Sequence, residues 1–202
     1  AGGIMRFSES FKIGVALHSP TYYTIEETYS TSLSTYFTEG ISFSEISPIN
    51  YFEYELTTPW KAIISASTIF KKFIIISMDY EVIDYAFTKL YSDNYSFIEE
   101  NEAIKNLYTQ ATNIRLGVEI NAKPFILRSG ISHYGSPYLN NDFSRYNYSY
   151  GIGIQNSGYF FDIAYVLSQG ENQHKLYSED YIAPTKVVNT KQNLILTVGI
   201  RY

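Results

Sequence analysis

Apolar and polar side chains alternate strictly over the last ten residues of the chain, Asn193 to Tyr202. Large apolar side chains occupy every second position from Leu194, and the positions between them are mostly smaller or polar. A period of two is typical of a strand with one apolar and one polar face. The segment also has the length of about 9–11 residues that a tilted strand needs to cross a bilayer. We therefore predict that its apolar face contacts lipid and its polar face lines a lumen.

The same alternation predicts further strands upstream, at 3–7, 11–17, 60–70, 73–86, 113–120, 125–134, 146–155 and 159–168. The register is ambiguous near Ile83 and Asp84, where a β-bulge is expected. Three long connections separate these strands, at about 21–58, 88–110 and 169–189. Within them, Tyr22 to Tyr29 is expected to prolong a strand, and Glu99 to Thr109 to form a short helix. About nine strands result.

Two regularities distinguish the fold class. Short turns near Ser8, Lys71, Ala122 and Ser157 alternate with long connections, as in outer-membrane barrels with tight periplasmic turns and long extracellular loops. Aromatic residues gather at both ends of the strands. They are Trp60, Tyr85, Tyr134, Tyr146 and Tyr148 near the long loops, and Phe11, Phe70, Phe125, Tyr159 and Tyr202 near the short turns. A soluble β-sandwich alternates too, but places aromatics at its two ends less regularly. We predict an all-β, antiparallel transmembrane β-barrel.

The direction of the strands predicts where the chain lies in the barrel. If Tyr202 ends in the periplasm, the first of nine alternating strands descends from outside the cell. A processed outer-membrane protein would begin in the periplasm, so Ala1 is expected to lie inside a larger barrel. Residues 1–202 are then one barrel portion without its early strands. Alternatively, the remaining eight strands close into a barrel by themselves.

Composition narrows the possible functions. The 202 residues include 21 Tyr and no Cys, and they carry a formal charge of −5. The absence of cysteine excludes zinc fingers, disulfide frameworks and thiol nucleophiles. No run of basic residues is present, which argues against a nucleic-acid partner. No stretch of about 18 apolar residues predicts a membrane-spanning helix. We expect no cofactor.

Several charged residues fall on the polar face of the predicted strands. They are Lys12, Lys61, Asp79, Glu81, Arg115, Glu119, Arg128, Asp162 and Arg201. We expect them to form a lumenal network of salt bridges, because isolated charges inside a barrel need partners. Glu119 and Arg128 flank the turn at 121–124 and are expected to pair diagonally across it. The alternative is a polar path or a site for the headgroup of a ligand.

The long loops contain more apolar side chains than solvated loops need. As candidates for a groove that binds a hydrophobic ligand we select Phe37, Phe43, Phe52, Phe97, Ile98, Ile104 and Leu107. The alternative is that these loops pack on one another to cap the barrel.

The sequence gives little support for a catalytic site or a metal site. None of the three histidines, His18, His133 and His174, belongs to a nucleophile motif, and His133 is predicted on the lipid face. The acidic residues Glu99, Glu100 and Glu102 are interpreted as a solvated loop and not as a metal site. We therefore expect neither an enzyme nor a metal centre.

Five segments in order resemble the C-terminal part of the FadL/TodX family of outer-membrane transporters for long-chain fatty acids and other hydrophobic compounds. The segments are 17–23 (LHSPTYY), 57–61 (TTPWK), 79–85 (DYEVIDY), 113–119 (NIRLGVE) and 127–138, which contains LRSG and SPY. Each motif alone is weak, but their order and spacing are fairly specific.

The resemblance implies a 14-stranded monomeric barrel whose N-terminal hatch plugs the lumen. Ligand would be captured by extracellular loops and would leave sideways into the membrane. The hatch and early strands are absent from these residues. The expected function is passive uptake of hydrophobic small molecules across a Gram-negative outer membrane, in contact with membrane lipid and lipopolysaccharide. The alternative is a structural barrel subunit with outer-membrane protein partners.

Overall fold

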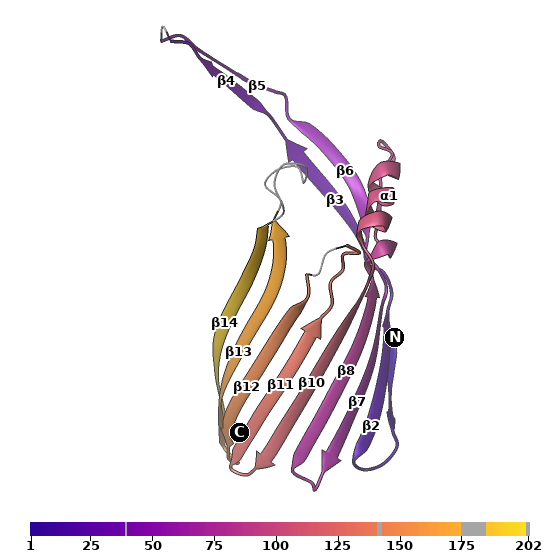
Figure 1. Ribbon diagram of the computed structural model, residues 1–202, viewed down its shortest axis with the longest axis vertical. Coiled ribbons are helices and arrows are strands. Elements are labelled where there is room, and N and C mark those ends of the chain that lie inside the picture. The colour runs from indigo at the N-terminus through magenta and orange to yellow at the C-terminus, as the bar shows by residue number, and fades with distance from the viewer. Residues whose placement is uncertain (39, 141–142, 175–184, 201–202) are drawn as a thin grey trace.

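The computed structural model describes residues 1–38, 40–140, 143–174 and 185–200. Its main element is a curved sheet of nine antiparallel strands in the order β1-β2-β7-β8-β10-β11-β12-β13-β14 (Figure 1). The strands are β1 (Gly2–Arg6), β2 (Phe11–His18), β7 (Lys61–Phe70), β8 (Ile74–Asp84), β10 (Gln110–Ala122), β11 (Phe125–Tyr134), β12 (Arg145–Gln155), β13 (Tyr159–His174) and β14 (Thr185–Ile200). The prediction of nine antiparallel strands is confirmed.

The sheet has two chemically different faces. Apolar and polar side chains alternate along each strand, and the pairing register aligns like with like across neighbouring strands. In one row across it, Met78 lies opposite Leu116, which in turn lies opposite Ile131. The neighbouring row, on the other face, joins Ser77, Gly117 and Gly130. The first face is apolar and exposed, with Leu116 45% exposed. The second face is concave and is lined by small and charged side chains.

Very little of the sheet is buried within the chain. Among the described residues only two apolar side chains are buried, Ala111 and Ile126. A soluble protein of this size normally buries a contiguous apolar core. An exposed apolar face that extends over nine strands therefore needs an apolar environment outside the chain.

The connections differ in length at the two ends of the strands (Figure 1). At one end are tight turns, including the Lys71–Lys72 turn, where both residues have positive φ (49° and 66°) as a type I′ hairpin requires. At the other end are the long connections. The aromatic side chains expected at the rims lie at strand ends, as Phe11, Phe70, Phe125 and Tyr159 do. The predicted alternation of loop lengths is thus confirmed, whereas Tyr202 lies outside the described residues.

The longest connection is an extended arm that rises from β2 and returns into β7 (Figure 1). At its base, β3 (Tyr22–Tyr29) and β6 (Asn50–Thr57) form a three-stranded sheet with β9 (Lys89–Tyr91), which belongs to the connection between β8 and β10. Its tip is a two-stranded sheet of β4 (Ser32–Tyr36) and β5 (Ser42–Ile46). The strand predicted at 22–29 is confirmed.

One α-helix, α1 (Ile98–Leu107), lies beside the base of the arm, close to the predicted helix at 99–109. No helix in the described residues is both long and apolar enough to cross a membrane.

Two sequence-based expectations are wrong. Strand β8 pairs with β7 and β10 in unbroken register to its end, so there is no bulge at Ile83 and Asp84. Instead the strand stops at Asp84, whose carboxylate accepts a 3.1 Å hydrogen bond from the Ala86 amide and caps the 3₁₀ turn η1 (Tyr85–Phe87). The loop expected at 169–189 is also partly strand, because β13 and β14 remain paired as far as His174 and Thr185.

Candidate functional site

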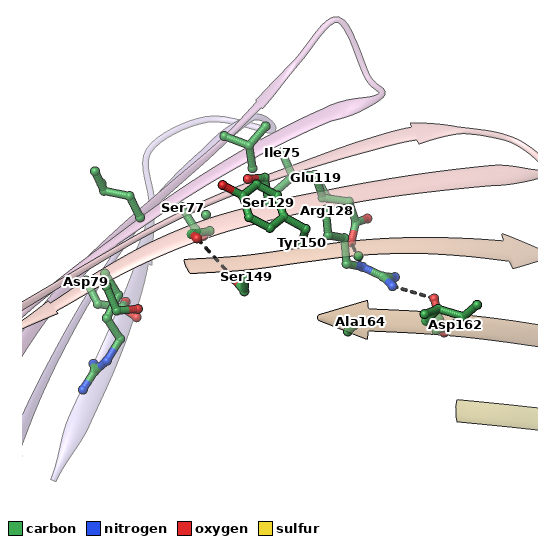
Figure 2. A pocket seen from close by; sticks show the side chains of 18 residues that line it. Ile75, Ser77, Asp79, Glu119, Arg128, Ser129, Ser149, Tyr150, Asp162 and Ala164 are labelled. Carbon is green, nitrogen blue, oxygen red and sulfur yellow. Dashed lines mark hydrogen bonds and ion pairs between the residues drawn. The ribbon is translucent and has the colours of Figure 1, made fainter. Parts of the chain in front are cut away.

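The concave face of the sheet contains a hollow of about 480 Å³ between β8 and β13 (Figure 2). Its floor consists of small residues on adjacent strands, among them Ser77, Gly117, Gly130 and Ser149. Small side chains leave open the space above the backbone, whereas clusters of charged side chains border the hollow on both sides along the strands. The polar face predicted to line a lumen is therefore hollowed.

The first charged cluster is centred on Glu81, which is 5% exposed. Its Oε1 accepts hydrogen bonds from Asn113 Nδ2 at 2.6 Å and from Arg115 Nη2 at 3.0 Å. Lys61 Nζ lies 3.9 Å from the other carboxylate oxygen. Asn113 also accepts a 3.2 Å hydrogen bond from the Gly135 amide, which ties the cluster to the loop after β11. The buried carboxylate is thus compensated by two cations and an amide.

An aromatic ring on β11 extends this cluster towards β12. Two guanidinium groups lie near Tyr134, with the Arg115 Cζ 5.6 Å and the Arg145 Cζ 4.4 Å from the ring centroid. These distances are within the range of cation–π interactions. Asn113, Tyr134 and Arg145 were missed as site residues by the sequence analysis. Each lies on the same face of its strand as Glu81, because they share one cross-strand row. This shared row is the signal that could have identified them, but it can be recognised only once the pairing register of the strands is known.

The second charged cluster is centred on Arg128, whose side chain joins three strands (Figure 2). Arg128 Nε lies 2.8 Å from Glu119 Oε2 on β10, and Nη1 lies 2.7 Å from Asp162 Oδ1 on β13. The expected pair of Glu119 and Arg128 is confirmed, although the two residues are directly opposite and not diagonal. Among the described residues Asp79 forms no ion pair. Arg201 lies outside the described residues. The predicted network therefore exists as two separate clusters.

Gly153 is expected to be essential for the second cluster. A Cβ atom at Gly153 would overlap the carboxylate of Asp162 on the neighbouring strand. The variant Gly153→Val should move this carboxylate away from Arg128 and lower the free energy of unfolding by about 1–3 kcal/mol. Denaturant titration in detergent micelles measures this change. The matched control is Gly3→Val, where a Cβ would have no atom within 4 Å. Equal losses in both variants would contradict the assignment.

The candidate ligand residues of the loops fall into two groups. At the tip of the arm, Phe37 and Phe43 form an edge-to-face pair with ring centroids 6.2 Å apart. At the base, the rings of Phe52 and Phe97 have centroids 6.1 Å apart. Figure 1 shows the tip at the far end of the arm from α1, so the structure brings together only part of the predicted set.

The base group is an aromatic cluster, which we call the base cluster and define as Phe52, Tyr54, Tyr95 and Phe97. Its closest rings, Tyr95 and Phe97, have centroids 4.8 Å apart in an edge-to-face arrangement. The two tyrosine hydroxyls donate hydrogen bonds to carboxylates, Tyr54 to Glu27 at 2.9 Å and Tyr95 to Glu100 at 2.7 Å. Each hydrogen bond raises the pKa of its tyrosine above the ordinary value, because the carboxylate accepts from the protonated phenol.

The remaining candidates extend from the base cluster along α1. Ile98 is 67% and Leu107 55% exposed, whereas Ile104 is half-buried. Phe97, Ile98 and Asn101 line a hollow with the loop at 90–96. An apolar surface that stays exposed beside such a hollow can take up a hydrophobic ligand.

The structure offers no metal site among the residues it describes, since no three acidic or histidine side chains converge there. His133 stacks on Tyr146 with ring centroids 4.7 Å apart, and its strand position places it on the apolar face as predicted. The side chain of His174 lies outside the described residues.

Comparison with known proteins supports the fold. No protein-family model matches the sequence, and no curated protein is significantly similar to it. Eleven chains of solved structures are similar to it, among them the following two. A FadL homologue from Pseudomonas aeruginosa has a TM-score of 0.58 and 11% identity, over 98% of this chain and 49% of that chain. The deltaS2S3 mutant of TodX, a monoaromatic hydrocarbon channel, has a TM-score of 0.56 and 10% identity, over 100% of this chain and 49% of that chain.

These similarities show that the sheet has the fold of a FadL-type β-barrel. The chain spans about half the length of each similar structure. Both structures carry the names of the family to which the sequence motifs point.

Proposed function

We propose that this chain forms the C-terminal part of an outer-membrane channel for passive uptake of hydrophobic small molecules, such as long-chain fatty acids. The observation that carries the proposal is the curved sheet with an exposed apolar face and a polar, hollowed face. Strands of this type suit a barrel wall between lipid and a lumen. The likeness to a FadL homologue and to a hydrocarbon channel supports the class of ligand.

We assign separate roles to the two regions of the site. The base cluster and the exposed residues of α1 would capture the ligand, because they offer the apolar surface next to a hollow. The charged clusters around Glu81 and Arg128 would hold the strands of the wall together, because their carboxylates are already neutralised by nearby cations. The small-residue floor between them leaves space inside the wall. The role we infer is passage of a ligand without catalysis.

Uptake by cells tests this proposal. The protein would be expressed in a Gram-negative host that lacks its own channel for hydrophobic compounds. We expect faster uptake of a fluorescent long-chain fatty acid, of toluene, or of both, and no change in the uptake of glucose. The two hydrophobic probes distinguish fatty acids from small aromatic hydrocarbons. Uptake of both hydrophobic probes at the rate of the empty host would contradict the proposal.

A structural subunit of a larger outer-membrane complex is the second candidate. The arm favours it, since β3 to β6 extend well beyond the ends of the barrel strands (Figure 1). Affinity purification from the native membrane distinguishes the two roles. A stable stoichiometric partner, with normal growth on hydrophobic substrates after deletion, would favour the structural role.

A further inference from the structure

The connection between β2 and β7, residues 19–60, carries negative charge without any positive charge of its own. Residues 19–60 contain six glutamates and no lysine or arginine. Four of these glutamates lie on the strands of the base, β3 and β6. The same two strands carry five tyrosines, at positions 22, 23, 29, 51 and 54. The acid-only composition extends over the whole arm and is not confined to one turn.

The two faces of the base sheet differ in how they are covered. Along β6, Phe52, Tyr54 and Leu56 are half-buried, while Tyr51, Glu53 and Glu55 between them are exposed. The half-buried face contributes Phe52 and Tyr54 to the base cluster, where both contact Phe97. The other face has no covering element among the described residues. We call it the docking face and define it by Tyr22, Glu26, Tyr51, Glu53, Glu55 and Tyr91.

Charges on the docking face are arranged unfavourably for the isolated chain. Glu26 lies directly opposite Glu53 in the pairing of β3 with β6. Like charges in directly opposed positions destabilise a strand pair. Within the described residues, neither these two carboxylates nor that of Glu55 accepts a hydrogen bond or forms an ion pair. The only basic residue on the three strands is Lys89 on β9, which lies opposite Thr57 on the same face, at its end near Tyr22.

Exposed tyrosines surround these carboxylates. Tyr22 is 73%, Tyr51 79% and Tyr91 58% exposed. Tyr91 lies opposite Glu55 in the pairing of β6 with β9, so an aromatic ring stands beside a carboxylate. Its hydroxyl donates a 2.6 Å hydrogen bond to Asp93, which adds another negative charge at the edge of the face. Flat aromatic rings next to carboxylates suit the guanidinium group of arginine, which stacks on rings and pairs with acids.

We propose that the docking face binds an arginine-bearing, basic segment of another protein outside the barrel. The partner's cations would neutralise the opposed glutamates and stack on the exposed tyrosines. Binding would therefore remove the like-charge repulsion that the isolated arm carries. The proposal concerns a partner of the arm and does not depend on transport of a ligand.

A fluorescein-labelled decapeptide with arginine at alternate positions and serine between them is the probe. Its binding to the full chain in detergent micelles is followed by fluorescence anisotropy. The triple variant Glu26→Gln, Glu53→Gln and Glu55→Gln should weaken binding about tenfold, since each substitution removes a negative charge that pairs with an arginine of the probe. Tyr51→Thr should weaken it about 2–5-fold, as expected for an exposed cation–π contact.

A matched control removes three charges elsewhere with Glu45→Gln, Glu99→Gln and Glu102→Gln, all exposed in the structure. We expect this control to change the affinity less than twofold, and circular dichroism to show the same strand content in every variant. Equal weakening in both triple variants would overturn the proposal, since only general charge attraction would remain. Self-association of the chain that is lost only in the docking-face triple would assign the face to a second copy and would also overturn it.

Discussion

Replacing Glu81 with leucine is expected to lower the free energy of unfolding by about 3 kcal/mol. The carboxylate is 5% exposed and accepts hydrogen bonds from Asn113 and Arg115. Without it, the buried amide and the guanidinium lose their shared acceptor, and an uncompensated charge remains on the concave face. The value lies at the low end for broken buried ion pairs because the side chain of Arg115 is still 31% exposed.

Denaturant unfolding in detergent micelles, followed by the fluorescence of the single tryptophan, Trp60, measures this loss. Asp79→Asn is the control, because Asp79 lies two residues away on the same face and has no ion pair among the described residues. The control should change stability by less than about 0.5 kcal/mol. Similar losses of unfolding free energy in both variants would show that the contacts of Glu81 do not stabilise the protein more than an unpaired carboxylate on the same face does.

Replacing Phe97 with alanine is expected to lower the affinity for a hydrophobic ligand about tenfold or more. Phe97 contacts three other rings of the base cluster and also lines the hollow beside α1. Its removal takes away both ligand contact area and the packing that holds the loop at 90–97 in place. The tip variant Phe43→Ala should change affinity less than twofold, because that ring lies at the far end of the arm.

Binding of a fluorescent fatty acid to the purified protein, measured at several ligand concentrations, gives these affinities. Ile98→Ser separates contact from folding, since Ile98 is 67% exposed and its loss should leave the unfolding midpoint unchanged. We expect Ile98→Ser to weaken binding without loss of stability. If Phe97→Ala and Ile98→Ser both bind normally, capture occurs elsewhere.

The strands of the barrel wall were predictable because one face of each is apolar and the other is not. The alternation from Phe11 to Leu17, for instance, marks β2 with no knowledge of its neighbours. The continuation of β13 and β14 to His174 and Thr185 was missed. There the sequence is polar on both faces, as in Glu171 and Asn172, so period two carries no contrast. The prediction of a bulge near Ile83 was wrong because pairing with β10 holds the strand in register to its end.

The charged clusters were predictable as a set of residues but not as pairs. Alternation alone assigns Glu81 and Arg115 to the polar face, but their contact depends on the pairing of two strands separated by a long connection and a helix. Only Glu119 and Arg128, joined by a tight turn, were paired from the sequence. The loop candidates show the same limit, since nothing local to Phe43 or Phe97 says which of them lies near the barrel.

Two adjacent residues test the central claim, that one face of the sheet meets lipid and the other a lumen. The chain has no cysteine, so Ser77→Cys and Met78→Cys each introduce a single site for a spin label. With the protein in lipid vesicles, collision rates with a water-soluble nickel complex and with lipid-soluble oxygen are measured by electron paramagnetic resonance. We predict that the label of Ser77→Cys meets mainly the nickel complex and the label of Met78→Cys mainly oxygen. Equal access of the nickel complex to both labels, or the reverse preference, would contradict the account.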